Sequence, residues 1–255
     1  MLDLLRKTVT QVIFTVYGAI VVFPMVWLGY TSFKTTEELF ADAWSLPEIW
    51  SLANFIEAWN EAQIGDFFWN SIFVTVSTLI LQLFLGSMAS YSLAKYQFRG
   101  SNLIYYAFLA GLMFPIFLGL VPLFFLMKSL HLLNSHLGLI LVYAAFGLPF
   151  TIFVLTAFFR TIPTTIMEAG IMDGCSHFKL YWSVMLPLAK PGIVTVGIFT
   201  FISIWNEYIL ALILLSSSHL RTLPLGIAVL QFVQFYEVDF GTLFAGLVIV
   251  MLPTL

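Results

Sequence analysis

Long apolar runs alternate with short polar stretches along most of the chain. Five of these runs are long enough for a membrane-spanning helix, which needs about 20 predominantly apolar residues, and a sixth is shorter. The pattern therefore predicts an all-α, polytopic membrane protein: a single transmembrane domain over residues 1–255 with six transmembrane helices. The predicted spans are residues 12–30, 70–93, 103–127, 137–159, 192–215 and 240–255.

The two ends of the sequence carry different signals. Arg6 and Lys7 precede the first run, as in a secretory signal peptide, but that run is longer than the roughly 7–15 residues of a signal core. We therefore interpret it as a span. The sixth run stops at Leu255 before a crossing is complete. We expect the natural chain to continue beyond this residue and to end in a basic cytoplasmic tail.

The composition excludes a water-soluble globular protein. Of the 255 residues, 61% are hydrophobic and 9% are charged, and the mean hydropathy is +1.01. Soluble domains carry about 25% charged residues. Cys175 is the single cysteine, so no internal disulfide can form, and we interpret it as a small residue in a turn.

The sequence carries no pattern that is typical of an enzyme. It contains no glycine-rich phosphate loop ending in Lys-Ser or Lys-Thr, so we expect no ATP hydrolysis by this chain. Its histidines show no metal-ligand spacing: His131, His136, His177 and His219. We expect no catalytic residue, no metal site and no cofactor in the chain, and no nucleic-acid partner.

The positive charges predict the orientation, because loops rich in Lys and Arg remain in the cytoplasm. Seven lie on one side of the predicted topology and three on the other: Arg6, Lys7, Lys95, Arg99, Arg160, Lys179 and Lys190 against Lys34, Lys128 and Arg221. The N-terminus and residues 161–191 are therefore predicted to be cytoplasmic. Residues 34–69, which are acidic, and residues 216–238 are predicted to form outer loops.

Residues 161–191 form a hydrophilic interruption between the fourth and fifth predicted spans, which we call the 161–191 loop. Pro163 suits a first helical turn, where its missing N–H needs no partner. Thr165 followed three residues later by Glu168 is a capping-box pattern that starts the same helix slightly later. Gly174 supplies a stop, because glycine accepts the left-handed conformation that closes many helices.

A second short helix is predicted after this turn. Ser176 can cap it, and Pro187 should follow its end, because a proline disfavours the helical conformation of the residue before it. The 161–191 loop is therefore expected to be two short helices joined by a turn.

The spacing of small, acidic and proline residues in this loop resembles a known motif. Glu168-Ala169-Gly170, then Asp173-Gly174, then Val184-x-Leu186-Pro187 and Pro191 resemble the EAA loop of permease subunits of bacterial ABC importers. Further stretches look like the carbohydrate-uptake branch, the maltose-type importers: Asn70-Ser71, residues 87–100, residues 158–163 and Trp205-Asn206-Glu207-Tyr208.

The resemblance implies that the first short helix of the loop is a coupling helix that docks in a cleft of an ATP-binding subunit. Ala169 and Gly170 are small enough for close approach, Glu168 can reach a basic residue, and Gly174 allows the reversal. The expected coupling residues are Glu168, Ala169, Gly170, Asp173, Gly174 and Pro187. The alternative is a loop that only connects two spans.

The resemblance also implies the partners and the location. They are a second permease subunit, a dimer of ABC ATP-binding subunits that hold ATP and Mg, an extracytoplasmic sugar-binding protein, membrane lipid and a carbohydrate substrate. The chain would lie in the bacterial cytoplasmic membrane with its N-terminus inside. Two alternatives stay open: an importer of another solute (a polyol, a glycerol phosphoester or an amino acid), or a non-transporting membrane scaffold for an ATPase.

A polar group inside the fifth predicted span is the candidate substrate path. Ionisable residues within a span usually face a cavity or the protein interior. Trp205 and Tyr208, three residues apart, can stack on a sugar ring, and Asn206 and Glu207 can bond its hydroxyls. The alternative is a polar clasp between two permease subunits. Asn70 is a weaker candidate, for which a helix cap is the alternative.

Overall fold

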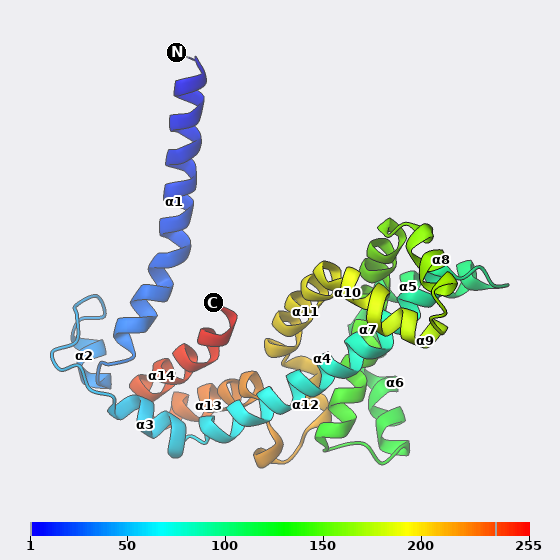
Figure 1. The fold of residues 1–255 in the computed structure, drawn as a ribbon. Helices are drawn as coiled ribbons and strands as arrows, with labels where there is room; N and C mark the ends of the chain where they lie inside the picture. The colour runs from blue at the N-terminus through cyan, green and yellow to red at the C-terminus, as the bar shows by residue number, and fades with distance from the viewer. Residues whose placement is uncertain (1, 238) are drawn as a thin grey trace. The chain divides into compact units, whose positions relative to one another are not determined.

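The computed structural model describes residues 2–237 and 239–255, and these residues form helices and turns without a strand. Figure 1 colours the helices in chain order from blue to red. The chain divides into two compact units, residues 1–68 with 223–255, and residues 69–222. Each unit is described by itself below.

The first unit is built around its last helix, α14. It contains α1 (Leu2–Thr31), α2 (Thr36–Ala41), α3 (Ala53–Asn60), α13 (Leu223–Glu237) and α14 (Phe240–Met251). Helix α14 packs against α1, α3 and α13. Aromatic edges join these helices: Trp27 meets Phe244 at 5.7 Å between ring centroids, and Phe40 meets Phe240 at 5.6 Å.

A buried lysine organises the connection after α1. Lys34 is 1% exposed, and its Nζ donates to the Asp42 carbonyl and to Ser45 Oγ, both at 2.8 Å. Asn54 Nδ2 donates to the carbonyls of Ser32 and Lys34. These bonds hold the end of α1, the segment after it and α3 together. The predicted outer segment is therefore an ordered part of the first unit.

The second unit surrounds α7 (His136–Thr161), which packs against α5 (Ser101–Leu112) and α11 (Lys190–Trp205). Ser135 caps α7 by accepting from the Gly138 N–H at 3.1 Å. A glycine lets α7 and α11 approach closely, since a Cβ on Gly192 would stand 2.5 Å from the Phe158 ring. The remaining helices are α4 (Ile64–Lys95), α6 (Ile116–Ser129), α8 (Thr164–Met172), α9 (His177–Leu180), α10 (Leu186–Leu188) and α12 (Ile209–Leu214).

Three helices in the described ranges 2–237 and 239–255 are long and apolar enough to cross a membrane, and each bent helix pair could add one crossing, giving up to five. They are Arg6–Thr31 within α1, Ile64–Lys95 and His136–Thr161. Helix α4 begins at Ile64 rather than at the predicted residue 70. Asp66 in its first turn favours this earlier start, because a carboxylate is stabilised at a helix N-terminus.

The predicted third and fifth spans each contain a helix break. Helices α5 and α6 are bent by 103° across Met113–Pro115, and the 177–188 helical segment is bent by 73° from α11. Pro115 causes the first break, since a proline disfavours the helical conformation of the residue before it. Residues 206–208 interrupt the fifth predicted span between α11 and α12.

The predicted outer loop 216–238 is largely helical, because α13 occupies Leu223–Glu237. Only the segment before Leu223 is a turn, and it contains a short 3-10 helix at Ser218–Leu220. The run LPLGIAVL is apolar enough for a packed helix, and Gly226 lets α13 approach closely, as a Cβ there would stand 2.1 Å from the Phe67 ring.

Candidate functional site

The first helix of the 161–191 loop is α8, which begins directly after Pro163. Pro163 occupies the capping position and makes no side-chain bond there. The predicted capping box between Thr165 and Glu168 is wrong, because Thr165 already lies inside the first helical turn. The alternative start signal, Pro163, is thus the better one.

The turn after α8 confirms the predicted stop at Gly174. Gly174 has φ +81°, in the left-handed region that favours glycine. Its N–H donates to the Ile171 carbonyl at 2.9 Å, and the Cys175 N–H donates to the Gly170 carbonyl at 3.0 Å. This pair of bonds is a Schellman motif, which satisfies carbonyls left open at a helix end. The reversal is therefore fixed by backbone bonds and by one glycine.

The second helix starts as predicted and ends later than predicted. Ser176 Oγ accepts from the Lys179 N–H at 3.3 Å and caps α9. The helix then continues through a π-helical segment, Tyr181–Met185, and through Pro187 to Leu188. In the π register the Leu186 N–H reaches the Tyr181 carbonyl, five residues back. This altered register accommodates Pro187, so the predicted end before Pro187 is wrong.

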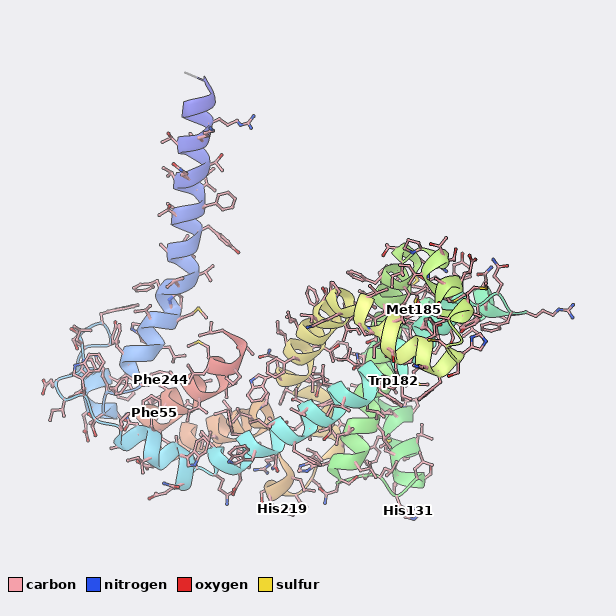
Figure 2. All side chains as sticks on the ribbon, viewed as in Figure 1. Phe55, His131, Trp182, Met185, His219 and Phe244 are labelled. Carbon is pink, nitrogen blue, oxygen red and sulfur yellow. The ribbon has the colours of Figure 1, made fainter. Side chains whose placement is uncertain are left out.

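The inner side of the 161–191 loop is anchored on α4 and α7. A buried cluster joins the loop to α4, α7 and α11: Tyr91, Leu155, Phe159, Ile162, Leu180, Tyr181, Met185, Ala189 and Val196. Polar bonds add to it. Ser87 Oγ lies 2.7 Å from Tyr181 Oη, and Tyr96 Oη lies 3.0 Å from His177 Nδ1. Lys95 Nζ donates to the Ile162 carbonyl. Figure 2 shows Met185 and Trp182 on the loop's second helix.

Five of the six expected coupling residues are exposed on the outer side of the loop. Glu168 and Ala169 are exposed on α8, and Asp173 and Gly174 are exposed at its end. Pro187 is exposed on α10. Gly170 differs, because it is half-buried and a Cβ there would stand 2.6 Å from Leu180 Cδ1. Its small size serves packing between α8 and α9.

The predicted substrate-path group lies at the break between α11 and α12. Trp205 is 1% exposed and stacks on Phe201 at 5.6 Å, so its ring packs in the interior. Because α11 ends at Trp205, Tyr208 does not continue a helical face with it. Asn206 is exposed, and its Nδ2 donates to the Ile202 carbonyl at 2.8 Å.

Glu207 caps α12 from the residue before its N-cap. Its Oε1 accepts from the Leu210 N–H at 2.8 Å, and its Oε2 accepts from the Ala211 N–H at 3.3 Å and from Tyr143 Oη. The first N–H groups of a helix have no partner within it, and a carboxylate at that end is stabilised by the helix dipole. Glu207 therefore joins α7 to the start of α12.

A cavity of about 370 Å³ opens beside this break. Helices α4, α6, α7, α11 and α12 all contribute to its wall. The polar side chains of the wall are Gln82, Tyr143, Thr200, Ser203 and Glu207, and the rings of its wall are Tyr143, Phe146, Phe150 and Phe199. Of these residues, the sequence pattern singled out Glu207 alone.

Gln82 is the main residue that the sequence reasoning missed. It is 1% exposed, and its Nε2 donates to Thr151 Oγ1 at 2.8 Å and to Thr200 Oγ1 at 3.1 Å. Gly147 makes room for it, since a Cβ there would stand 2.2 Å from Gln82 Oε1. An amide in the middle of an apolar run was the available signal, because such groups face the protein interior.

Asn70 does not cap a helix, because α4 begins at Ile64 and Asn70 lies inside it. Its Nδ2 donates to the carbonyls of His219 and Arg221 at 2.8 and 3.0 Å. It therefore holds the turn before Leu223 against α4. His131 lies in a turn and His219 in the 3-10 helix Ser218–Leu220 (Figure 2). No three His, Cys, Asp or Glu side chains of the described residues form a metal-binding group.

Comparison with known proteins identifies the family. Residues 82–255 match the family described as binding-protein-dependent transport system inner membrane component. The chain is 43% identical to the diacetylchitobiose uptake system permease protein NgcG of Streptomyces coelicolor, over 97% of this chain and 82% of that protein. It is 32% identical to the trehalose transport system permease protein SugB of Mycobacterium tuberculosis, over 97% of this chain and 90% of that protein.

A solved structure has the same fold. It is the crystal structure of a bacterial ABC transporter involved in the import of the acidic polysaccharide alginate, which superposes with a TM-score of 0.85 over 98% of this chain and 93% of that one, at 22% identity. The resemblance to permease subunits of bacterial ABC importers is thus confirmed. This chain belongs to the binding-protein-dependent transport system inner membrane components, the permease subunits of ABC importers.

Proposed function

We propose that the chain forms half of the pore of an ATP-driven importer of sugars or oligosaccharides. Its partners are a second permease subunit, a dimer of ATP-binding subunits and an extracytoplasmic sugar-binding protein. The observation that carries the proposal is the 161–191 loop. Helix α8 presents Glu168 and Ala169 to solvent, while a Schellman turn and a buried cluster fix it to α4 and α7.

The loop can transmit a movement of the ATP-binding subunits to the membrane helices only if it is rigidly anchored to them. A partner that displaces α8 also displaces α9, because Gly170 and Leu180 are in close contact. The helical segment 177–188 leads directly into α11, which ends beside the cavity. Packed elements of this kind move as units rather than deforming continuously. The coupling residues proposed are Glu168, Ala169, Asp173 and Gly174 as the contact surface, with Gly170 and Pro187 as supports.

The names of the relatives favour a sugar as the substrate. Diacetylchitobiose, trehalose and arabinooligosaccharides appear in the names of permeases that are 43%, 32% and 32% identical to this chain. We infer that this chain serves a short carbohydrate.

Deletion of the gene from its host tests whether the transported substrate is a sugar. We expect uptake of one labelled oligosaccharide from a panel containing diacetylchitobiose and trehalose to be lost and to return with the wild-type gene. Loss of amino-acid or glycerol-phosphoester uptake instead would indicate another solute. Unchanged uptake of every compound, together with a co-purifying ATPase, would indicate that the chain is a non-transporting membrane scaffold for an ATPase.

We further propose six crossings, made by α1, α4, α5 with α6, α7, α11 with α12, and α14. Helix α5 starts near the 161–191 loop, where Arg160 lies 5.0 Å over the Tyr105 ring, and α6 leads through a short turn to the opposite end of α7. Helix α11 likewise starts near the loop, and α12 ends where the Asn134 N–H donates to the Leu214 carbonyl at 2.8 Å. Each pair therefore runs from one end of α7 to the other.

The orientation proposed places the N-terminus and the 161–191 loop in the cytoplasm. A Cys175→Ser chain has no thiol, so single cysteines at Lys179 and at Glu48, both exposed, report the two sides. We expect a membrane-impermeant maleimide to label Glu48→Cys in intact cells and Lys179→Cys only after permeabilisation. Labelling of Lys179→Cys in intact cells would show the opposite orientation.

A further inference from the structure

The cavity beside the α11–α12 break contains a hydrogen-bond acceptor without a partner. Gln82 Oε1 is buried and accepts no hydrogen bond, although the amide nitrogen of the same side chain donates to two threonines. A buried acceptor without a partner destabilises the folded protein, because its lost contact with water is not replaced. Buried polar groups of this kind are ordinarily satisfied, and Gln82 lines a space large enough for a ligand.

The charge of the cavity favours a neutral ligand. Glu207 is the carboxylate of the cavity wall, and it already accepts from two backbone N–H groups and from Tyr143 Oη. These donors and the α12 N-terminus stabilise the negative charge of Glu207, so no cationic ligand is required to balance it. A second anion would be repelled by the carboxylate at this short range.

The cavity wall has a polar part and an aromatic part. Together they suit a sugar ring, which presents both hydroxyl groups and C–H groups. Gln82 Oε1, Thr200 and Ser203 supply polar atoms, while Phe150 and Phe199 pack edge to face at 6.1 Å between ring centroids. The negative face of an aromatic ring attracts the weakly positive hydrogens of C–H groups. The volume, about 370 Å³, is within the roughly 300–1,000 Å³ of small-molecule sites.

We propose that this cavity binds one neutral sugar ring during transport, with Gln82 Oε1 accepting a hydrogen bond from a ring hydroxyl. The inference rests on the proposed function and adds a substrate site within this subunit. Gly147 is part of the site, because only a residue without a Cβ leaves space for the Gln82 amide. Gln82 is thus a binding residue, and Thr151 and Thr200 are positioning residues that hold its amide.

The test is equilibrium binding of radiolabelled diacetylchitobiose or trehalose, whichever wild-type cells import, to the purified complex without its binding protein. Gln82→Met keeps the side-chain length and removes the acceptor, and we expect its Kd to rise about tenfold or more, the effect of one lost hydrogen bond to a buried group. The matched control is Thr78→Val, which removes a buried, unpartnered hydroxyl one turn earlier on α4 and outside the cavity. Its Kd should be unchanged.

A second variant keeps the proposal testable if Gln82→Met lowers the yield of the complex. Ser203 is exposed on the cavity wall, so Ser203→Phe should assemble normally and occupy the space needed by the sugar, abolishing binding. Wild-type Kd values for both variants would overturn the sugar site, even while cells import the sugar. Absence of sugar uptake by wild-type cells would instead overturn the proposed function.

Discussion

Replacing Glu168 by lysine is expected to detach or uncouple the ATP-binding subunits while leaving this chain folded. Glu168 is exposed on α8, and the proposed docking surface centres on it. Breaking a buried, hydrogen-bonded charge pair at an interface costs about 2–5 kcal/mol, which is more than tenfold in affinity. We expect co-purification of the ATP-binding subunit to fall at least tenfold and sugar-stimulated ATP hydrolysis to be lost.

The matched control is Glu48→Lys, the same charge reversal at an exposed carboxylate in the predicted outer segment. It should leave both co-purification and ATP hydrolysis at wild-type values. Equal losses in the two variants would show a general effect of charge. Wild-type values for Glu168→Lys would contradict docking through α8.

Replacing Glu207 by alanine is expected to destabilise the complex by about 2–4 kcal/mol, because it removes the partner of Tyr143 and the cap of α12. Tyr143 is 5% exposed, so its hydroxyl would lose its partner in a buried position. Thermal unfolding followed by size-exclusion chromatography should show a transition several degrees lower. Asn206→Ala, which removes a bond from an exposed neighbour, should shift it little.

A double-mutant cycle identifies the cause of this loss. If the two side chains act on each other, Tyr143→Phe with Glu207→Ala should be less destabilising than the sum of the single changes. Strict additivity would contradict this coupling. Wild-type stability of Glu207→Ala would show that the carboxylate serves neither α12 nor Tyr143, and would leave the substrate path or the inter-subunit clasp as its role.

Local chemistry made the turn of the 161–191 loop predictable. Gly174 and Ser176 act through bonds to residues within four positions in sequence, so their residue types determine the geometry. The capping box failed because Pro163 started the helix earlier. The role of Gly170 needed Leu180, ten residues away, and could not be inferred from the helix alone.

Tertiary packing decided the features that the sequence did not predict. The break at residues 206–208 contains no glycine or proline, and it persists because Tyr143 on α7 and the α12 amides share Glu207. Gln82 gained its partners from α7 and α11, at positions 69 and 118 residues away. Helix periodicity carries no information about such distant pairs, whereas the all-α fold and the apolar helices followed directly from run length.

ATP-driven sugar accumulation by the complete complex in proteoliposomes tests the central claim most directly. The ATP is supplied on the side of the ATP-binding subunits, and the binding protein with labelled sugar on the other. We expect sugar to accumulate against its gradient with ATP, to stop with a non-hydrolysable analogue, and to be lost in Glu168→Lys. ATP hydrolysis at the wild-type rate without sugar movement, or accumulation that does not require hydrolysis, would contradict the account.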